Sequence, residues 1–350
     1  MPHETNGSAG REHRDGSLVQ RRRHDRGAHE TGGRDVVRAV RHARDPDDAA
    51  VEPAPLHRAV PPARDEGLPP DEVVTSDDGL WVVEANGKKR RLAPYGAASW
   101  SPFGRFVVAT RGGTELVALE PDGAVRWTLA RRDVHSAVWG GTRTDTRIAY
   151  IDRTALRVVA GDGTGDRLLA PAEEGPLAWR PGGGHQLAYV SGSEVRVQQT
   201  DTGRVLWRAN RGPVERVRAL VWSDDGSRLL VLSTHALRVF DGAGRELVHV
   251  EPDGVGRYTD ATFVPGTQRV VVLLNDTDVV LRDTGQTLFR GSGLAGVTPS
   301  PDGRWLLVTW PRADQWVFVG PGGRLRAVAG ITEQFRSRSG FPRVEGWCCS

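Results

Sequence analysis

The chain has 350 residues, a formal net charge of +3, 38% hydrophobic residues and two cysteines. A net charge so close to zero argues against a strongly basic nucleic-acid-binding protein, and two cysteines exclude a disulfide-rich scaffold. No apolar run approaches the ~18 residues of a membrane-spanning helix, and no apolar core of about 7 to 15 residues follows the N-terminal charges as in a secretory signal. Taken literally, the sequence predicts a soluble, cytoplasmic protein.

Residues 1–71 differ in composition from the rest of the chain. They contain no Phe, Tyr, Trp or Ile, but six of the ten histidines. Such a segment buries too little apolar surface to offset chain entropy, so we predict a disordered tail and linker. Acidic residues offset its arginines and no aromatic residues interleave with them, which favours a solvated tail over a nucleic-acid-binding arm. A wrongly assigned start or a shifted frame in GC-rich DNA is an alternative origin of this composition.

From Glu72 onward the sequence is repetitive. An aromatic or proline residue followed by a small turn returns at intervals of 39, 40, 43, 41 and 36 residues. This period predicts a β-propeller, because one four-stranded blade cannot bury both of its faces and must stack on its neighbours. The marker residues are Trp100, Trp139, Trp179, Trp222, Phe263 and Pro299.

One repeat is long enough for four strands. Its apolar residues come in short runs separated by turn formers, which indicates strands and not helices. In the second repeat the strands are expected at 98–100, 105–110, 115–120 and 125–129. Outer hairpin turns that contain glycine, which supplies a positive φ, occur seven times and predict seven blades; in six of them the glycine follows Asp or Asn by one or two residues.

The first blade lacks a first strand of its own, because the segment beginning at Glu72 starts directly with a second strand. Residues 344–349 place Trp347 where Trp100 stands in its own repeat. We therefore predict that the last strand pairs with residues 72–76. That pairing would close an all-β, seven-bladed propeller over residues 72–350 without a free edge.

Two turns carry a family resemblance. Residues 222–226 (Trp-Ser-Asp-Asp-Gly) and 300–305 (Ser-Pro-Asp-Gly-Arg-Trp) resemble the core of WD40-like repeats of the TolB type. The end of the chain, residues 341–349, together with residues 160–167, is similar to a group of uncharacterised bacterial propeller proteins. The second resemblance implies a hydrophobic anchor ahead of the propeller, and hence the sensor domain of a membrane-anchored protein in the cell envelope.

A third resemblance implies an enzyme. Residues 202–207 (Thr-Gly-Arg-Val-Leu-Trp) are similar to the end of the quinoprotein propeller repeat, where tryptophans dock neighbouring blades around pyrroloquinoline quinone. Only two of the seven repeats show the pattern. A hairpin turn followed by a blade-packing aromatic residue is therefore the favoured interpretation, and we predict no cofactor.

Cysteine and histidine residues do not define a catalytic or metal site. Cys348 and Cys349 are adjacent, and either a vicinal disulfide or a reduced, buried pair fits that spacing, but two thiols alone cannot complete a zinc site. No metal-ligand pairing, nucleophile elbow or phosphate loop accompanies the histidines. The histidines of the repeats are scattered over several blades, at positions His135, His185, His235 and His249.

The function predicted is a monomeric, non-catalytic binding module. Loops between the second and third strands can vary on a rigid ring, so we expect them to contact a protein, peptide or small ligand on one face or at the mouth of the channel. A quinoprotein-like or hydrolytic propeller and a membrane-anchored sensor domain are the alternatives, and no nucleic-acid partner is expected. The candidate contact residues are Arg111, Arg153, His235, Asp276, Trp310 and Arg312.

Overall fold

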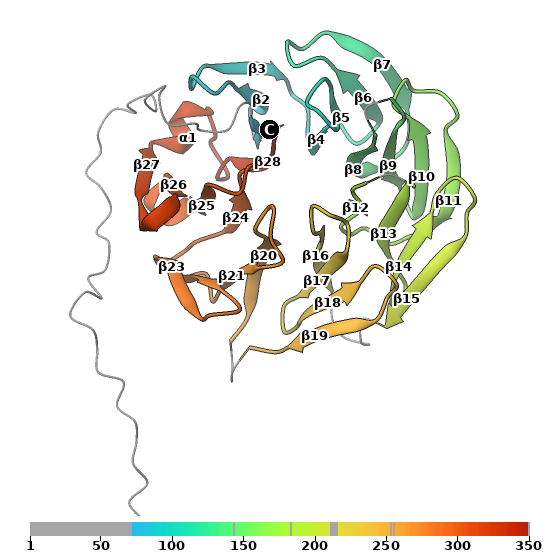
Figure 1. The fold of residues 1–350 in the computed structure, drawn as a ribbon. Coiled ribbons are helices and arrows are strands. Elements are labelled where there is room, and N and C mark those ends of the chain that lie inside the picture. Colours follow the sequence, from blue (N-terminus) through green and yellow to red (C-terminus); the bar gives the residue numbers. More distant parts are fainter. Residues whose placement is uncertain are drawn as a thin grey trace, which may run out of the picture. The chain divides into compact units, whose positions relative to one another are not determined.

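The chain folds into seven four-stranded antiparallel sheets (Figure 1). The structure, a computed structural model, describes residues 72–142, 144–182, 184–210, 216–252, 254 and 256–348. The tail predicted for residues 1–71 lies outside the described residues, as does Cys349. Within the described ranges, no helix has the length and apolar character that crossing a membrane requires.

Each sheet is one blade, whose first strand lies near the axis and whose fourth strand lies at the rim (Figure 1). Blade 1 is β28 (Arg343–Trp347), β1 (Glu72–Ser76), β2 (Gly79–Val83) and β3 (Lys89–Ala93); blade 2 is β4 (Ala98–Trp100), β5 (Val107–Arg111), β6 (Glu115–Leu119) and β7 (Val125–Ala130). Blade 3 is β8 (Val134–Gly141), β9 (Thr146–Asp152), β10 (Ala155–Ala160) and β11 (Arg167–Pro171); blade 4 is β12 (Ala178–Trp179), β13 (Gln186–Ser191), β14 (Glu194–Gln199) and β15 (Val205–Asn210).

The remaining blades repeat the pattern. Blade 5 is β16 (Val217–Trp222), β17 (Arg228–Ser233), β18 (Leu237–Asp241) and β19 (Glu246–Val250); blade 6 is β20 (Tyr258–Phe263), β21 (Val270–Leu274), β22 (Asp278–Leu281) and β23 (Gln286–Arg290). Blade 7 is β24 (Gly296–Pro299), β25 (Leu306–Trp310), β26 (Gln315–Val319) and β27 (Leu325–Ala329). A short helix, α1 (Ile331–Gln334), leads from blade 7 to β28.

The hydrophobic core is divided among the junctions between blades. Seven clusters of buried side chains each combine residues of two neighbouring blades. The second strands are therefore buried on both faces, which explains their uninterrupted apolar runs. The cluster that joins blade 7 to blade 1 contains Trp81, Trp305 and Trp316, and it closes the ring.

Strand β28 supplies the first strand of blade 1, as predicted. It pairs antiparallel with β1, with Glu72 opposite Trp347 and Thr75 opposite Arg343. The Thr75 hydroxyl donates a 2.5 Å hydrogen bond to Glu345 of β28. The prediction of a closed seven-bladed ring is confirmed.

Asp77 fastens the connection that leads into β28. Its carboxylate, in the turn between β1 and β2, accepts the backbone N–H groups of Arg338 at 2.7 Å and Ser339 at 2.8 Å. Its other oxygen accepts the Ser337 hydroxyl at 2.7 Å. These hydrogen bonds, led by that of Ser337, hold the pKa of Asp77 well below its usual range.

The aspartates of the Ser-x-Asp-Gly turns have structural roles. The Ser223 hydroxyl donates to Asp225 at 2.6 Å, and the Ser300 hydroxyl donates to Asp302 at 2.5 Å. Each carboxylate also accepts a backbone N–H two residues further on. Blade 2 has Phe103 at this position, with a φ of 74° that is unusual for a bulky residue.

The turns fall into two sets because successive strands run in opposite directions. Turns between second and third strands share one end of the blades with the connections from each blade to the next. Backbone hydrogen bonds tie the two kinds of segment together, for example from Val134 to Gly113 at 2.9 Å and from Tyr258 to Thr234 at 2.9 Å. We call this end the connection face; its inter-strand turns are residues 77–78, 112–114, 153–154, 192–193, 234–236, 275–277 and 311–314.

Candidate interaction surface

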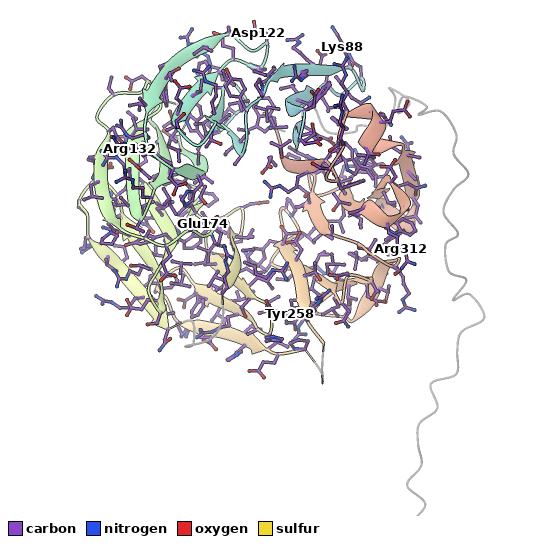
Figure 2. All side chains as sticks on the ribbon, turned by 180° about the vertical axis from the view of Figure 1, so that it is seen from behind. Lys88, Asp122, Arg132, Glu174, Tyr258 and Arg312 are labelled. Atoms are coloured by element: carbon purple, nitrogen blue, oxygen red, sulfur yellow. The ribbon has the colours of Figure 1, made fainter. Side chains whose placement is uncertain are left out.

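All six candidate contact residues lie at inter-strand turns of the connection face, at the end of a second strand or within the turn that follows it. The structure brings three of them together, because Asp276 of blade 6 and Trp310 and Arg312 of blade 7 all contact the connection of residues 291–295. Arg111, Arg153 and His235 stand on separate turns of blades 2, 3 and 5. Figure 2 shows the ring from behind, with Arg312 on blade 7 and Tyr258 on the adjacent blade 6.

Asp276 forms the blade 6 side of this assembly. With φ angles of 54° and 58°, Asn275 and Asp276 make a left-handed turn, a conformation that Asn and Asp tolerate well. The backbone oxygen of Asp276 accepts the N–H groups of Gly293 at 3.0 Å and Leu294 at 2.8 Å. Its carboxylate accepts hydrogen bonds from Arg257 and Thr259.

Trp310 and Arg312 form the blade 7 side. The Trp310 indole donates to the backbone oxygen of Ser292 at 2.9 Å, while Arg312 donates to the Ser292 hydroxyl at 2.7 Å. A Cβ atom at Gly293 would lie 2.9 Å from the Arg312 Cβ atom, so glycine permits this close approach. Trp310 is only 7% exposed and packs edge-on against Phe289, so its ring supports the turn and offers little contact surface.

The exposed polar part of this assembly is Arg257, Asp276, Ser292 and Arg312, which we call the blade 6/7 turn cluster. Arg257 and Asp276 form an ion pair with side chains 54% and 30% exposed. Arg312 is exposed, and among the described residues its side-chain acceptor is a neutral hydroxyl. The cluster therefore presents one positive charge that no described carboxylate neutralises.

The other three candidate residues stand apart from this assembly. Arg111 pairs with Glu115 on the next strand and lies 5.9 Å from the Tyr95 ring. His235 is exposed in the turn between β17 and β18. Arg153 is exposed as well, and its backbone N–H donates to Asp133 at 3.2 Å.

Arg153 occupies a backbone conformation that suits glycine better. Its φ is 60°, and the corresponding residue of blade 4 is Gly192 with a φ of 56°. A left-handed conformation costs a residue with a side chain roughly 1–2 kcal/mol, and glycine loses about 0.5–1 kcal/mol more chain entropy on folding. Arg153→Gly is therefore expected to raise the free energy of unfolding by about 0.5 kcal/mol, measured by urea denaturation.

Thr154→Gly is the matched control, because Thr154 does not have a positive φ and the substitution should lower stability by about 0.5–1 kcal/mol. If Arg153→Gly lowers stability as much as the control does, the Arg153 side chain holds the turn in place and the strain argument is wrong.

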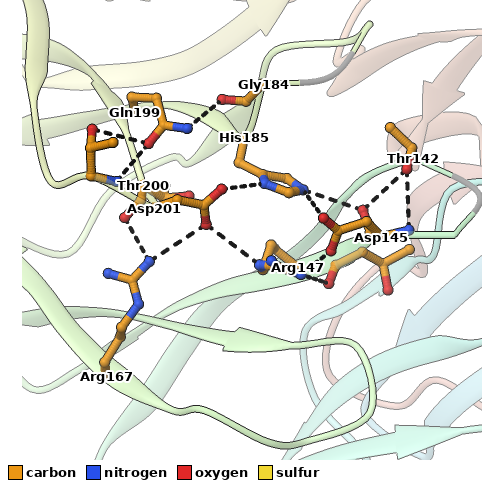
Figure 3. A network of polar contacts seen from close by, with 11 residues as sticks. Thr142, Asp145, Arg147, Arg167, Gly184, His185, Gln199, Thr200 and Asp201 are labelled. Carbon is orange, nitrogen blue, oxygen red and sulfur yellow. Dashed lines mark hydrogen bonds and ion pairs between the residues drawn. The ribbon is translucent and has the colours of Figure 1, made fainter.

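Sequence reasoning missed a polar network at the opposite end of the blades (Figure 3). His185 is 8% exposed and lies between two carboxylates, with Nδ1 2.7 Å from Asp201 and Nε2 3.6 Å from Asp145. Burial by itself would raise the pKa of Asp201, but the hydrogen bond and charge of His185, with the charge of Arg147, outweigh it and lower that pKa.

This network joins blade 3 to blade 4, since Asp145 comes from the turn before β9 and His185 from the turn before β13. The chain's only Gly-His pair, Gly184-His185, was the available signal. Its partner Asp201 follows 16 residues later, a spacing that no local pattern connects to it.

The quinoprotein-like segment serves packing. Thr202 and Gly203 lie in the turn between β14 and β15, and the Trp207 ring lies 5.6 Å from the ring of Phe240 in blade 5. Among the described residues no group of three or more His, Cys, Asp or Glu could hold a metal ion. Cys348 is buried and is not a free thiol, while Cys349 lies outside the described residues, so the vicinal disulfide stays a prediction.

Comparisons with known proteins support the architecture. No family model matches the sequence, and no curated protein matches it. Among solved structures, the C-terminal WD40 domain of Sif2 is similar with a TM-score of 0.56, covering 71% of this chain and 78% of that one at 17% identity. At this identity the likeness shows the fold alone. Together with the seven four-stranded blades, it defines a WD40-like propeller.

Proposed function

We propose that this protein is a non-catalytic interaction module that binds a protein or peptide partner through its connection face, with the blade 6/7 turn cluster at the centre of the contact. The observation that carries the proposal is the convergence of two inter-strand turns and one blade connection on Ser292 and Asp276. Fold alone does not assign function, so the proposal rests on these residues.

The cluster is suited to recognition because it is held in place before any partner arrives. Backbone hydrogen bonds from Gly293 and Leu294 to Asp276 fix the connection. The buried Trp310 ring supports Ser292 by donating a hydrogen bond to its backbone oxygen. A contact group that is already ordered loses less conformational entropy on binding.

The chemistry of the cluster favours a partner carboxylate. Arginine is enriched among the residues that contribute most to protein interfaces, and its guanidinium pairs with carboxylates through strong, directional hydrogen bonds. Among the described residues Arg312 forms no ion pair, so a partner's Asp, Glu or C-terminus can take that place. The expected partner therefore presents an acidic group to blade 7.

Charge reversal at Arg312 tests the proposal. Partners are captured by cross-linking in native lysate with wild type, Arg312→Glu and the control Arg304→Glu, and the affinity of the purified partner is then measured. Arg304 is an exposed arginine of the same blade, in the turn between β24 and β25 at the opposite end. We expect Arg312→Glu to weaken binding at least about 30-fold, because reversal leaves two carboxylates opposed.

The control should bind like wild type, since Arg304 lies away from the connection face. A partner that binds all three proteins equally, or one that only Arg304→Glu loses, would overturn the assignment of the connection face.

A further inference from the structure

Asp260 lies on β20, the first strand of blade 6, next to Thr259, whose hydroxyl bonds to Asp276 of the blade 6/7 turn cluster. The Oδ2 atom of Asp260 accepts the backbone N–H of Val297 at 2.9 Å, and Val297 belongs to β24, the first strand of blade 7. Its Oδ1 atom accepts the N–H of Ala261 at 2.8 Å. A single carboxylate thus bridges the innermost strands of two neighbouring blades.

The local backbone directs this side chain toward blade 7. The pairing of β20 with β21 shifts register between Tyr258 and Asp260, which leaves Thr259 in a bulge. Thr259 donates its hydroxyl to Asp276 in the turn cluster, while Asp260 turns to Val297. A Cβ atom at position 296 would lie 3.3 Å from Oδ2, so Gly296 leaves room for the carboxylate.

Few charges compensate Asp260. Burial raises the pKa of Asp260 to about 6, although the N–H groups of Val297 and Ala261 and the charge of Arg218 act in the opposite direction. Arg218, on β16 of blade 5, donates instead to the backbone oxygen of Tyr258 at 3.2 Å. From blade 7 the backbone at Gly296 and Val297 lies against the carboxylate, and neither of these residues titrates.

We propose that Asp260 is a pH-dependent link, here called the latch, between blades 6 and 7. Its ionisation state sets how strongly the carboxylate holds β24 to β20 next to the blade 6/7 turn cluster. The ionised carboxylate accepts the Val297 N–H in a charge-assisted hydrogen bond, whereas the neutral carboxyl is a weaker acceptor and carries a donor of its own. Proton uptake therefore exchanges a strong inter-blade hydrogen bond for relief from a buried charge.

The effect on stability has a definite sign. An unfolded Asp titrates near pH 3.9, well below the folded value of about 6, so the folded state binds the extra proton between these limits. The stabilisation is complete below about pH 4 and is lost as the pH rises through about 6. Between pH 4.5 and pH 7.5 this group alone should lower the folding equilibrium constant about 25-fold.

Two measurements on the full chain test the latch. In wild type, the amide resonance of Val297 should titrate with a midpoint near pH 6. In urea denaturation, the ratio of the wild-type folding constant to that of Asp260→Asn should fall about 25-fold from pH 4.5 to pH 7.5. Glu72, whose burial raises its pKa to about 8, is present in both proteins and cancels in the ratio.

The matched control is Asp122→Asn, an exposed aspartate in the turn after β6, which should keep the wild-type pH profile. A Val297 amide that does not titrate between pH 5 and pH 7 overturns the latch, even if Asp260→Asn fails to fold. If Asp260→Asn folds and the ratio of the wild-type folding constant to that of the variant is the same at pH 4.5 and pH 7.5, the latch is overturned as well. The link between the latch and partner recognition rests on the proposed function. Neither measurement needs a partner, so the latch and the proposed function can fail separately.

Discussion

Deleting residues 341–350 is expected to lower the melting temperature of the propeller by about 10 °C or more, because about 4 kcal/mol of stabilisation is lost. The deletion removes β28, the strand that pairs with the inner edge of β1. It also removes Trp347, whose ring stacks 6.1 Å from Phe318 in the cluster that joins blade 7 to blade 1. The loss therefore affects both the sheet of blade 1 and the last inter-blade junction.

Differential scanning calorimetry of the full and shortened chains provides the measurement. A synthetic peptide of residues 338–350, added in excess, should restore part of the lost stability, since binding to the folded state shifts the melting temperature upward. An unchanged melting temperature after deletion would show that the β28–β1 pairing does not hold the ring closed.

The second large effect is expected at Asp166, where Asp166→Ala should lower the free energy of unfolding by about 3 kcal/mol. The carboxylate is 9% exposed and joins blade 2 to blade 3. It accepts hydrogen bonds from Arg131, the residue after β7, from Arg157 on β10 at 2.5 Å and from the Tyr150 hydroxyl at 2.6 Å. Its removal leaves two guanidinium groups without their shared counter-charge.

The pH dependence of this effect follows from the same contacts. Burial by itself would raise the pKa of Asp166, but hydrogen bonds from Arg157, Tyr150 and Arg131 outweigh it and lower that pKa. A lowered pKa adds stability above the unfolded value of about 3.9, and this is lost as the pH falls further. The difference between wild type and Asp166→Ala should accordingly shrink below about pH 4.

Urea denaturation at pH 7 and pH 3.5 measures both claims, with the exposed residue Glu174→Ala as the control. The control should change stability by less than about 0.5 kcal/mol. An effect of Asp166→Ala no larger than that of Glu174→Ala would show that the network contributes little to the junction.

The fold could be predicted in detail because its signals are local. All seven outer hairpin turns contain glycine, in six cases one or two residues after Asp or Asn, and each second strand is an apolar run flanked by turn formers. Even the closure by β28 was predictable, since the first blade lacked a strand and Trp347 marked a spare one. The common position of Arg111, Arg153, His235, Asp276 and Arg312 at inter-strand turns followed from the same repeat.

The polar contacts between blades could not be predicted in this way. Asp166, His185 and Asp260 each bond to residues of a neighbouring blade, and the partners stand 35, 40 and 37 residues away. The inter-blade partner of each of these residues belongs to another repeat, so the pattern within one repeat does not indicate it. The environment of such a residue depends on the register of two strands and on a bulge or a glycine at the contact, as at Gly296.

The sequence by itself therefore determined the repeating unit, the number of blades and the strand that closes the ring, because strand and turn propensities act over a few residues and repeat seven times. Only the tertiary structure decided which turns meet. Stacking of blades 6 and 7 brings Asp276 and Arg312 to one connection, turns Trp310 into support for it, and leaves Arg111, Arg153 and His235 apart. Contacts of this kind between turns depend on packing between blades, and no local pattern in the chain encodes that packing.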